Sequence, residues 1–204
     1  MKKYPHILIE ASGNINLDTI ADKNNLYGLG PVEYLSGELL IVNGKAYKST
    51  VVTDSTMRVE ETYKVKAPFF GYANIKSWTE QLLPDSIQTI AQLEAYLNQI
   101  TKISKRPFIF KLEGIIEKAT IHIVNLPKGS KVSSPDDAHQ GQINYHLQNE
   151  QVEIIGFFST EHKAILTHHD TFLHMHLITK DKTKMGHLDE VLLKNGIKLY
   201  LPVN

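Results

Sequence analysis

The 204-residue chain contains no cysteine, and its only arginines are Arg58 and Arg106. The absence of cysteine excludes disulfide bonds, thiolate metal ligands and a thiol nucleophile. Scarce arginine argues against nucleic-acid binding, because arginine dominates protein contacts to phosphates and base edges. The 22 basic and 22 acidic residues balance, so no net charge draws the chain to a nucleic acid or to a membrane surface.

Other common signatures are also missing. No apolar run approaches the roughly 18 residues that a membrane span needs. The first residues lack the apolar core and small-residue cleavage site of a signal peptide, so we expect a cytoplasmic protein if the chain is complete. The sequence holds no phosphate-binding loop, dinucleotide fingerprint or Gly-x-Ser-x-Gly elbow. A hydrophobic fraction of 42% is ordinary for a globular protein.

The clearest local signal in the first half is a hairpin. Residues 37–42 and 45–49 are strand-like and flank Asn43-Gly44, a dipeptide typical of tight two-residue hairpin turns. Further along, apolar residues recur at helical spacing between residues 86 and 103, which predicts a helix there. We therefore expect this half to combine strands with one long helix.

Residues 104–107, which end in proline, interrupt that helical pattern. Beyond this break the pattern consists mostly of strands. We place a domain boundary here, with an N-terminal lobe over residues 1–105 and a mainly β lobe over residues 106–204. The predicted fold class is α/β, in the sense of mixed α and β, with two lobes built on β-sheets.

The most informative pattern is a histidine pair followed by a third histidine. His174 and His176 are two positions apart in an apolar run, so on a strand their side chains share one face. The polar run 180–186 is turn-prone, so His187 would return on an adjacent strand. Three neutral imidazoles in this arrangement suit zinc, or another borderline divalent cation, with positions left open for water or substrate. The alternative is that the pair is packed or lies on the surface, without a metal.

Several segments resemble the α-acetolactate decarboxylase family. The resemblance begins with a glycine-glutamate hairpin, continues through a proline-phenylalanine strand and a glycine segment, and ends in the histidine pattern. The matching segments, in the family's order, are Gly28-Leu29-Gly30, Leu35-Ser36-Gly37-Glu38-Leu39, Asn43-Gly44-Lys45-Ala46-Tyr47, Ala67-Pro68-Phe69-Phe70, Phe110-Lys111-Leu112-Glu113-Gly114, Ile155-Gly156-Phe157 and His174-Met175-His176-Leu177 with Gly186-His187.

This resemblance implies two αβ domains with zinc in a cleft between them. It implies that His174, His176 and His187 are the zinc ligands and that Glu38 approaches the metal from the first domain. The implied reaction is the decarboxylation of 2-acetolactate to acetoin without an organic cofactor. Loss of CO2 from a β-keto acid leaves an enediolate, and a divalent cation stabilises its developing negative charge. The implied partner is thus a small keto or hydroxy acid, and a homodimer is one assembly to test.

The sequence also departs from the family. The family's catalytic arginine falls on His122, which cannot form the permanently charged fork that holds a carboxylate but can still do acid–base work. Ser36 replaces an aspartate, and the family continues beyond Leu201 into a tail that carries another active-site glutamate in some members. Two further hypotheses follow: a catalytically degenerate protein that binds a metal or ligand, and a metal-dependent lyase or hydrolase that acts on another hydroxy or keto acid.

Two further polar clusters are expected in solvated loops; the alternatives are that the first lines the mouth of the cleft and that the second belongs to a lid. They are His168 and His169, just before the histidine strand, and Asp136, Asp137 and His139, in the long polar connection over residues 125–150.

Overall fold

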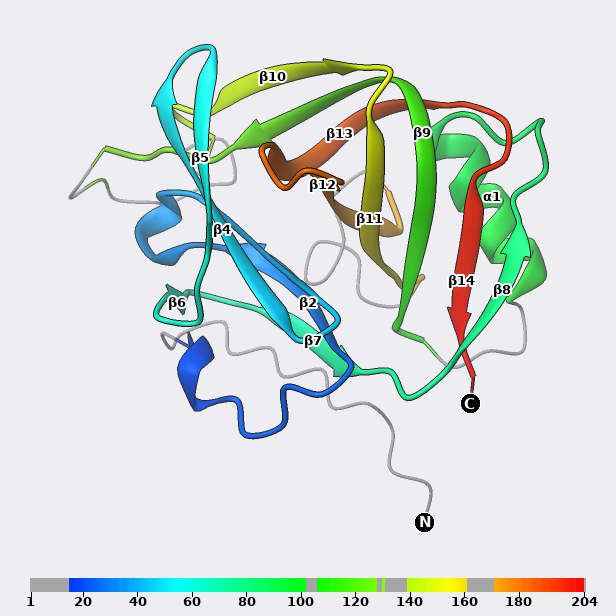
Figure 1. Cartoon of the computed structure of the whole chain (residues 1–204), viewed down its shortest axis with the longest axis horizontal. Helices are drawn as coiled ribbons and strands as arrows, with labels where there is room; N and C mark the ends of the chain where they lie inside the picture. Colours follow the sequence, from blue (N-terminus) through cyan, green and yellow to red (C-terminus); the bar gives the residue numbers. More distant parts are fainter. Residues whose placement is uncertain (1–14, 102–105, 128–129, 131–138, 161–170, 204) are drawn as a thin grey trace.

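The computed structural model describes residues 15–101, 106–127, 130, 139–160 and 171–203 (Figure 1). Its elements, in chain order, are β1 (Ile15–Asn16), η1 (Leu17–Thr19), β2 (Leu26–Pro31), η2 (Glu33–Leu35), β3 (Glu38–Val42), β4 (Lys45–Thr53), β5 (Thr56–Glu61), β6 (Lys66–Ala67), β7 (Gly71–Asn74), β8 (Trp78–Leu82), α1 (Ile90–Ile100), β9 (Phe108–Ile123), β10 (Ile143–Gln148), β11 (Gln151–Phe158), β12 (Leu173–Thr179), β13 (Met185–Leu193) and β14 (Lys198–Pro202).

The first sheet has five strands in the order β5-β4-β3-β2-β7. The predicted hairpin forms its centre, since β3 and β4 pair antiparallel with Val42 opposite Lys45. Asn43 and Gly44 both have positive φ, 48° and 78°, as a two-residue hairpin turn of this type requires. Every residue of β3 is buried, so this strand lies between two packed layers.

The second sheet is organised around β9, a strand of 16 residues. Its first half pairs with β11 and β14, and its second half pairs with β13 and β10. Because β11 also pairs with β12, and β12 with β13, the strands β9, β11, β12 and β13 form a closed ring. Strand closure removes the exposed edges that an open sheet would leave, and the result is a small barrel.

Helix α1 packs against this barrel (Figure 1). It begins at Ile90, within the predicted helix, and its N-terminus carries a capping box in which Thr89 and Gln92 satisfy each other's backbone N–H groups. Its buried residues Leu93 and Leu97 belong to the same apolar cluster as the barrel interior. The helical spacing of these leucines explains why this element could be predicted from the sequence.

The two sheets pack against each other through a mixed apolar layer. The first sheet contributes residues such as Leu40 and Val42, and the barrel contributes Ile155, Phe157 and Ile178. Alternation along each strand separates this layer from the neighbouring ones: Leu39 and Ile41 of β3 belong to a different cluster, on the outer side of the first sheet. Residues that follow the Leu40 and Val42 alternation therefore point toward the barrel.

These observations correct the predicted fold class. The prediction that the fold is built on β-sheets is confirmed, but the α/β class is not, because α1 and two short 3-10 turns are the only helices among the described residues. Seven strands were not predicted, namely β1, β2, β5, β6, β8, β10 and β14. Of these, β1 and β6 have only two residues each, and β5, β8 and β10 are polar and largely exposed on one face, which weakens the apolar alternation that marks a strand.

The predicted boundary at residue 105 stays a prediction. Strand β8 and helix α1 precede it, yet β8 pairs with β14 of the second sheet and α1 packs on the barrel. Residues 7–9, an apolar run that predicts a short strand, lie outside the described residues. Among the described helices, none is long and apolar enough to cross a membrane.

Gly114 lies in β9 just before its partner changes from β11 to β13, between Ile115 and Ile116. Its φ is +154°, and a Cβ atom there would lie 2.6 Å from Ile197 Cδ1. We expect Gly114→Ala to lower the free energy of unfolding by roughly 2–5 kcal/mol, from backbone strain and overpacking together. The measurement is urea-induced unfolding at equilibrium.

Gly196→Ala is the matched control for this prediction. Gly196 also has a positive φ, +82°, but a Cβ atom there would meet nothing within 4 Å. The control should cost only about 1 kcal/mol, the conformational penalty alone. Equal losses in the two variants would contradict the expected clash with Ile197 at Gly114.

Candidate metal centre

The alternation of side chains along β12 brings two histidines to the layer between the sheets. Met175 and Leu177 point into the barrel interior, and Ile178 lies in the layer between the sheets. His174 and His176 have the same parity as Ile178, so they share its face and point toward the first sheet. The barrel thus presents the two imidazoles to β3.

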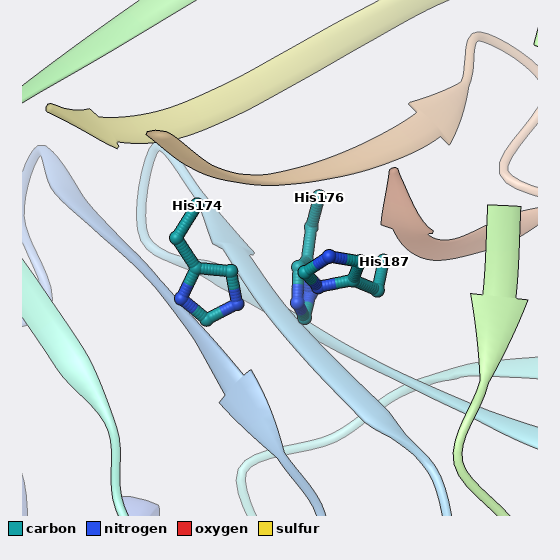
Figure 2. A group of neighbouring side chains, drawn as sticks. All are labelled: His174, His176 and His187. Carbon is teal, nitrogen blue, oxygen red and sulfur yellow. The ribbon is translucent and has the colours of Figure 1, made fainter. Parts of the chain in front are cut away.

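His187 completes the group from the neighbouring strand. It stands opposite His176 in the β12–β13 pairing, as expected for a strand that returns after the turn. Figure 2 shows the three rings converging from these two strands. One ring nitrogen from each of the three histidines lies within 4.8 Å of the others, so this group could hold a metal ion.

The imidazole of His176 is buried without a hydrogen bond among the described residues, which is rare for a polar group in a protein interior. Its side chain is completely buried, and neither ring nitrogen makes a hydrogen bond. Burial lowers its pKa well below 6.5, His174 and His122 lower it further, and the nearby backbone of Leu39 only partly opposes this. His176 is therefore a neutral imidazole with a lone pair available, the state in which histidine coordinates metals.

Glu38 reaches the histidines from the first sheet. It has the parity of Leu40 and Val42, so its side chain points toward the barrel. Its Oε2 lies 3.6 Å from His176 Nε2, and its Oε1 accepts a hydrogen bond of 3.2 Å from the backbone N–H of Val124. Burial raises the pKa of Glu38 well above 4.5, the Val124 bond opposes this, and the charge of Asp189 adds to the rise.

The turn that precedes Glu38 is strained and is hydrogen-bonded to the segment that follows β9. Tyr34 and Leu35 both have positive φ, 62° and 51°, a conformation that is costly for residues with bulky side chains. The Leu35 carbonyl accepts a hydrogen bond of 2.9 Å from Leu126 N–H. At Gly37 a Cβ atom would lie 2.3 Å from the Ser49 carbonyl oxygen. Strained backbone persists where surrounding contacts fix it, as they do here beside Glu38.

His122, which the sequence resemblance led us to expect at the position of an arginine, also lies at this centre. It stands opposite His187 in the β9–β13 pairing, and the two rings stack at a centroid distance of 4.6 Å. Its Nδ1 lies 2.8 Å from both carboxylate oxygens of Asp189. The ring of His139 meets it edge-on at 5.6 Å. His122, His187 and Asp189 form a second group whose ligand atoms lie within 4.8 Å of one another.

The structure thus brings together all five residues singled out from the sequence: Glu38, His122, His174, His176 and His187. Two neighbours were not among them. Asp189 had no signal beyond its position two residues after His187. His139 is exposed and lies in a turn, as expected, but its contact with His122 was not foreseen. His168, His169, Asp136 and Asp137 lie outside the part of the chain that the structure describes.

A centre of histidines and one buried carboxylate between two β-sheets defines the chain as a β-protein with a candidate metal site. The family model "Alpha-acetolactate decarboxylase" matches residues 10–201. The chain belongs to the α-acetolactate decarboxylase family, as a divergent member.

Individual relatives agree with this membership at low identity. The α-acetolactate decarboxylase of Brevibacillus brevis is 27% identical over 199 residues, which cover 93% of this chain and 64% of that protein. The chain thus spans just under two thirds of that relative's length. The enzyme of Lactococcus lactis subsp. cremoris is 25% identical over 179 residues, or 85% of this chain and 70% of the relative.

The fold agrees as well. The crystal structure of acetolactate decarboxylase from Bacillus subtilis subspecies spizizenii superposes with a TM-score of 0.75 and 18% identity, covering 95% of this chain and 80% of that one. A Staphylococcus aureus protein described as similar to α-acetolactate decarboxylase gives a TM-score of 0.67 with 18% identity, covering 97% of this chain and 81% of that one.

The raised pKa of Glu38 gives a prediction for the metal-free protein. A carboxyl whose folded pKa is raised destabilises the fold as pH rises from about 4.5 toward the folded pKa, because the folded state then binds more protons than the unfolded state. In Glu38→Gln the amide oxygen would still accept from Val124, and the amide would place an N–H toward His176. We expect this change, with chelator present, to raise Tm at pH 7 by at least about 2–4 °C.

The measurement is Tm against pH between 5 and 8, where the variant should show a flatter curve than the parent protein. Glu60→Gln is the control, because Lys48 lowers the pKa of that exposed carboxyl. The stabilisation from Glu60 is complete above about pH 4.5, so this control should leave the slope between pH 5 and 8 unchanged. Parallel curves for Glu38→Gln and the parent protein would contradict the prediction.

Proposed function

We propose that this protein is a zinc-dependent decarboxylase that converts 2-acetolactate, or a close β-keto acid, to acetoin and CO2. The family supplies the reaction class, since its curated members are decarboxylases of acetolactate. The observation that carries the proposal for this chain is the cluster of His174, His176 and His187 in the layer between the sheets. Zinc, rather than another divalent cation, is favoured by the nitrogen-rich donor set.

The residues present fit such an ion. Among the described residues, neither nitrogen of the buried His176 has a hydrogen-bond partner that meets the usual geometry, and a cation would take up a lone pair of this ring. His174, His176 and His187 would hold the ion, with Glu38 either as a further ligand or as a group beside it. When bound, the ion supplies positive charge for the ketone and hydroxyl oxygens of the substrate as CO2 departs.

The protein groups around the ligands then have separate tasks. Glu38 reaches the centre from the opposite sheet and is anchored by Val124 N–H, so its free oxygen is placed to transfer a proton to or from the substrate. His122 lies beside His187 and faces the substrate in this proposal. The apolar layer behind Glu38, which includes Leu40 and Ile178, limits the access of water from that side.

A second candidate function is supported by His122 itself. A histidine cannot replace the permanent charge and fork geometry of an arginine. Arg58 pairs with Glu60 on β5, and Arg106 lies over the Phe158 ring, so neither of the chain's two arginines takes over that position. A protein that binds a metal or ligand in this fold without decarboxylation is the alternative, as is a related lyase or hydrolase on another hydroxy or keto acid.

The three histidines are the proposed zinc ligands, so removing any one of them should weaken the binding of zinc. Changes to the groups that support a metal's ligands weaken metal binding roughly 10–100-fold. His174→Ala, His176→Ala and His187→Ala each remove a ligand itself, so we expect each to weaken zinc binding by more than this. Release of acetoin from 2-acetolactate should fall in parallel. The measurements are zinc content after dialysis, by elemental analysis, and a colorimetric acetoin assay.

His146→Ala is the matched control, because His146 is an exposed residue of β10 whose ring nitrogen contacts the Thr120 hydroxyl. It should keep both zinc and activity. Purified protein that binds one zinc per chain but releases no acetoin would overturn the substrate assignment and leave the metal site standing. A parent protein that binds no zinc would overturn the site.

The His122→Arg variant distinguishes an active decarboxylase from a protein that only binds a metal or ligand. His122→Arg restores the forked, permanent charge that suits a substrate carboxylate. If the centre is otherwise intact, this change should lower the KM for acetolactate, by about tenfold for one added charge-assisted hydrogen bond. A variant and parent protein that are both inactive, although loaded with zinc, would favour the binding function.

A further inference from the structure

Asp189 occupies an irregular position in β13. Leu188 pairs with Ile121 and Glu190 pairs with Thr120, so Asp189 is an extra residue with no partner of its own on β9. This is a β-bulge, a device that redirects a side chain and often lies next to active sites. The redirected carboxylate turns to His122, which follows Ile121 on β9.

His122 and Asp189 are in close contact, and the chemistry of the carboxylate determines which of the two donates the hydrogen bond. Both carboxylate oxygens of Asp189 lie 2.8 Å from His122 Nδ1. An ionised carboxylate only accepts hydrogen bonds, so Nδ1 is the donor and carries a proton. His122 is buried, with 3% of its surface exposed, and its stacking on His187 restrains the ring from turning over.

We propose that Asp189 is a positioning residue that holds His122 in its Nδ1–H form and thereby makes Nε2 the nitrogen that accepts a hydrogen bond from substrate. This inference rests on the proposed function. Nε2 of such an imidazole accepts from a hydroxyl group, whereas an arginine at this position donates to a carboxylate. In the parent protein, the hydroxyl of a 2-hydroxy-3-keto acid would then lie against His122, and its carboxylate would take this place only in the His122→Arg variant.

The alternative role for Asp189 is that of a metal ligand. His122, His187 and Asp189 are close enough together to hold a cation, and in that arrangement Asp189 would give an oxygen to the ion. The tautomer of His122 and the zinc content of Asp189 variants distinguish the two uses, and neither depends on activity.

The first measurement is NMR of the zinc-loaded protein with ¹⁵N-labelled histidine, using two-bond ¹H–¹⁵N correlations. The spectrum of His122→Gln assigns the His122 signals by their absence. In the parent protein we expect Nδ1 of His122 to be protonated and Nε2 to be unprotonated. In Asp189→Ala we expect the His122 proton to shift toward Nε2, with the zinc content unchanged.

Asp189→Asn provides a second variant of nearly the same shape, in case Asp189→Ala does not fold. Its amide can present an N–H to His122, so it should also populate the other tautomer. Glu190→Gln is the matched control, because Glu190 is the exposed neighbour within the same bulge. This control should leave the His122 signals in place.

The kinetic measurement adds a readout that a purely structural role would not change. With acetolactate as substrate, we expect the Asp189 variants to lower kcat about 10–100-fold, the range typical of lost orienting partners, and to change KM less than about threefold. A role in stability alone would lower Tm without this split between kcat and KM.

The outcomes that overturn the inference are specific. Unprotonated Nδ1 in the parent protein, or an unchanged His122 tautomer in both Asp189 variants, would remove the positioning role. Loss of zinc from these variants would make Asp189 a metal ligand instead. A protein that releases no acetoin in any form would overturn the proposed function, while the NMR result would still decide the role of Asp189.

Discussion

Glu38 and His176 belong to different sheets, and both are buried because those sheets pack face to face. Burying a carboxyl group and an imidazole costs free energy unless each finds a partner. The apolar layer beside them, with residues such as Leu40 and Ile178, offsets that cost and holds the two groups 3.6 Å apart. The turn before Glu38 is linked to the segment after β9 by the hydrogen bond from Leu126 N–H to the Leu35 carbonyl. A cation that bound here would stabilise the folded state over the unfolded one.

The parts of this arrangement that could be predicted from the sequence depend on local periodicity. The two-residue spacing of His174 and His176 determines a shared face on any strand, and the turn-prone residues before His187 place the third imidazole beside them. The Asn43-Gly44 turn and the helix over residues 90–100 are equally local. Glu38 is different: its hairpin position alone would suggest an exposed face, and only the family resemblance singled it out.

The parts that could not be predicted depend on pairing between distant segments. The position of Asp189 beside His122 requires a bulge, and a bulge is a property of the register between β13 and β9 rather than of either strand alone. His139 lies in a polar segment whose composition is typical of loops, although its ring meets His122. The closure of the ring around the 16-residue strand β9 was likewise hidden, because it depends on the pairing of β9 with β11 and β13 rather than on a local pattern.

The bulge at Asp189 has a consequence for how this centre can diverge. A residue within a regular ladder is constrained twice, by its cross-strand neighbour and by the alternation that assigns it to one face. A residue inserted in a bulge lacks a partner of its own, so its side chain can be exchanged without moving the strands that carry the histidines. If the proposed function holds, position 189 would therefore act on the substrate side of the centre without altering the strands that carry the three histidines. A substitution in such a bulge could therefore change the substrate preference of a family member while the strand pairing of the fold stays the same.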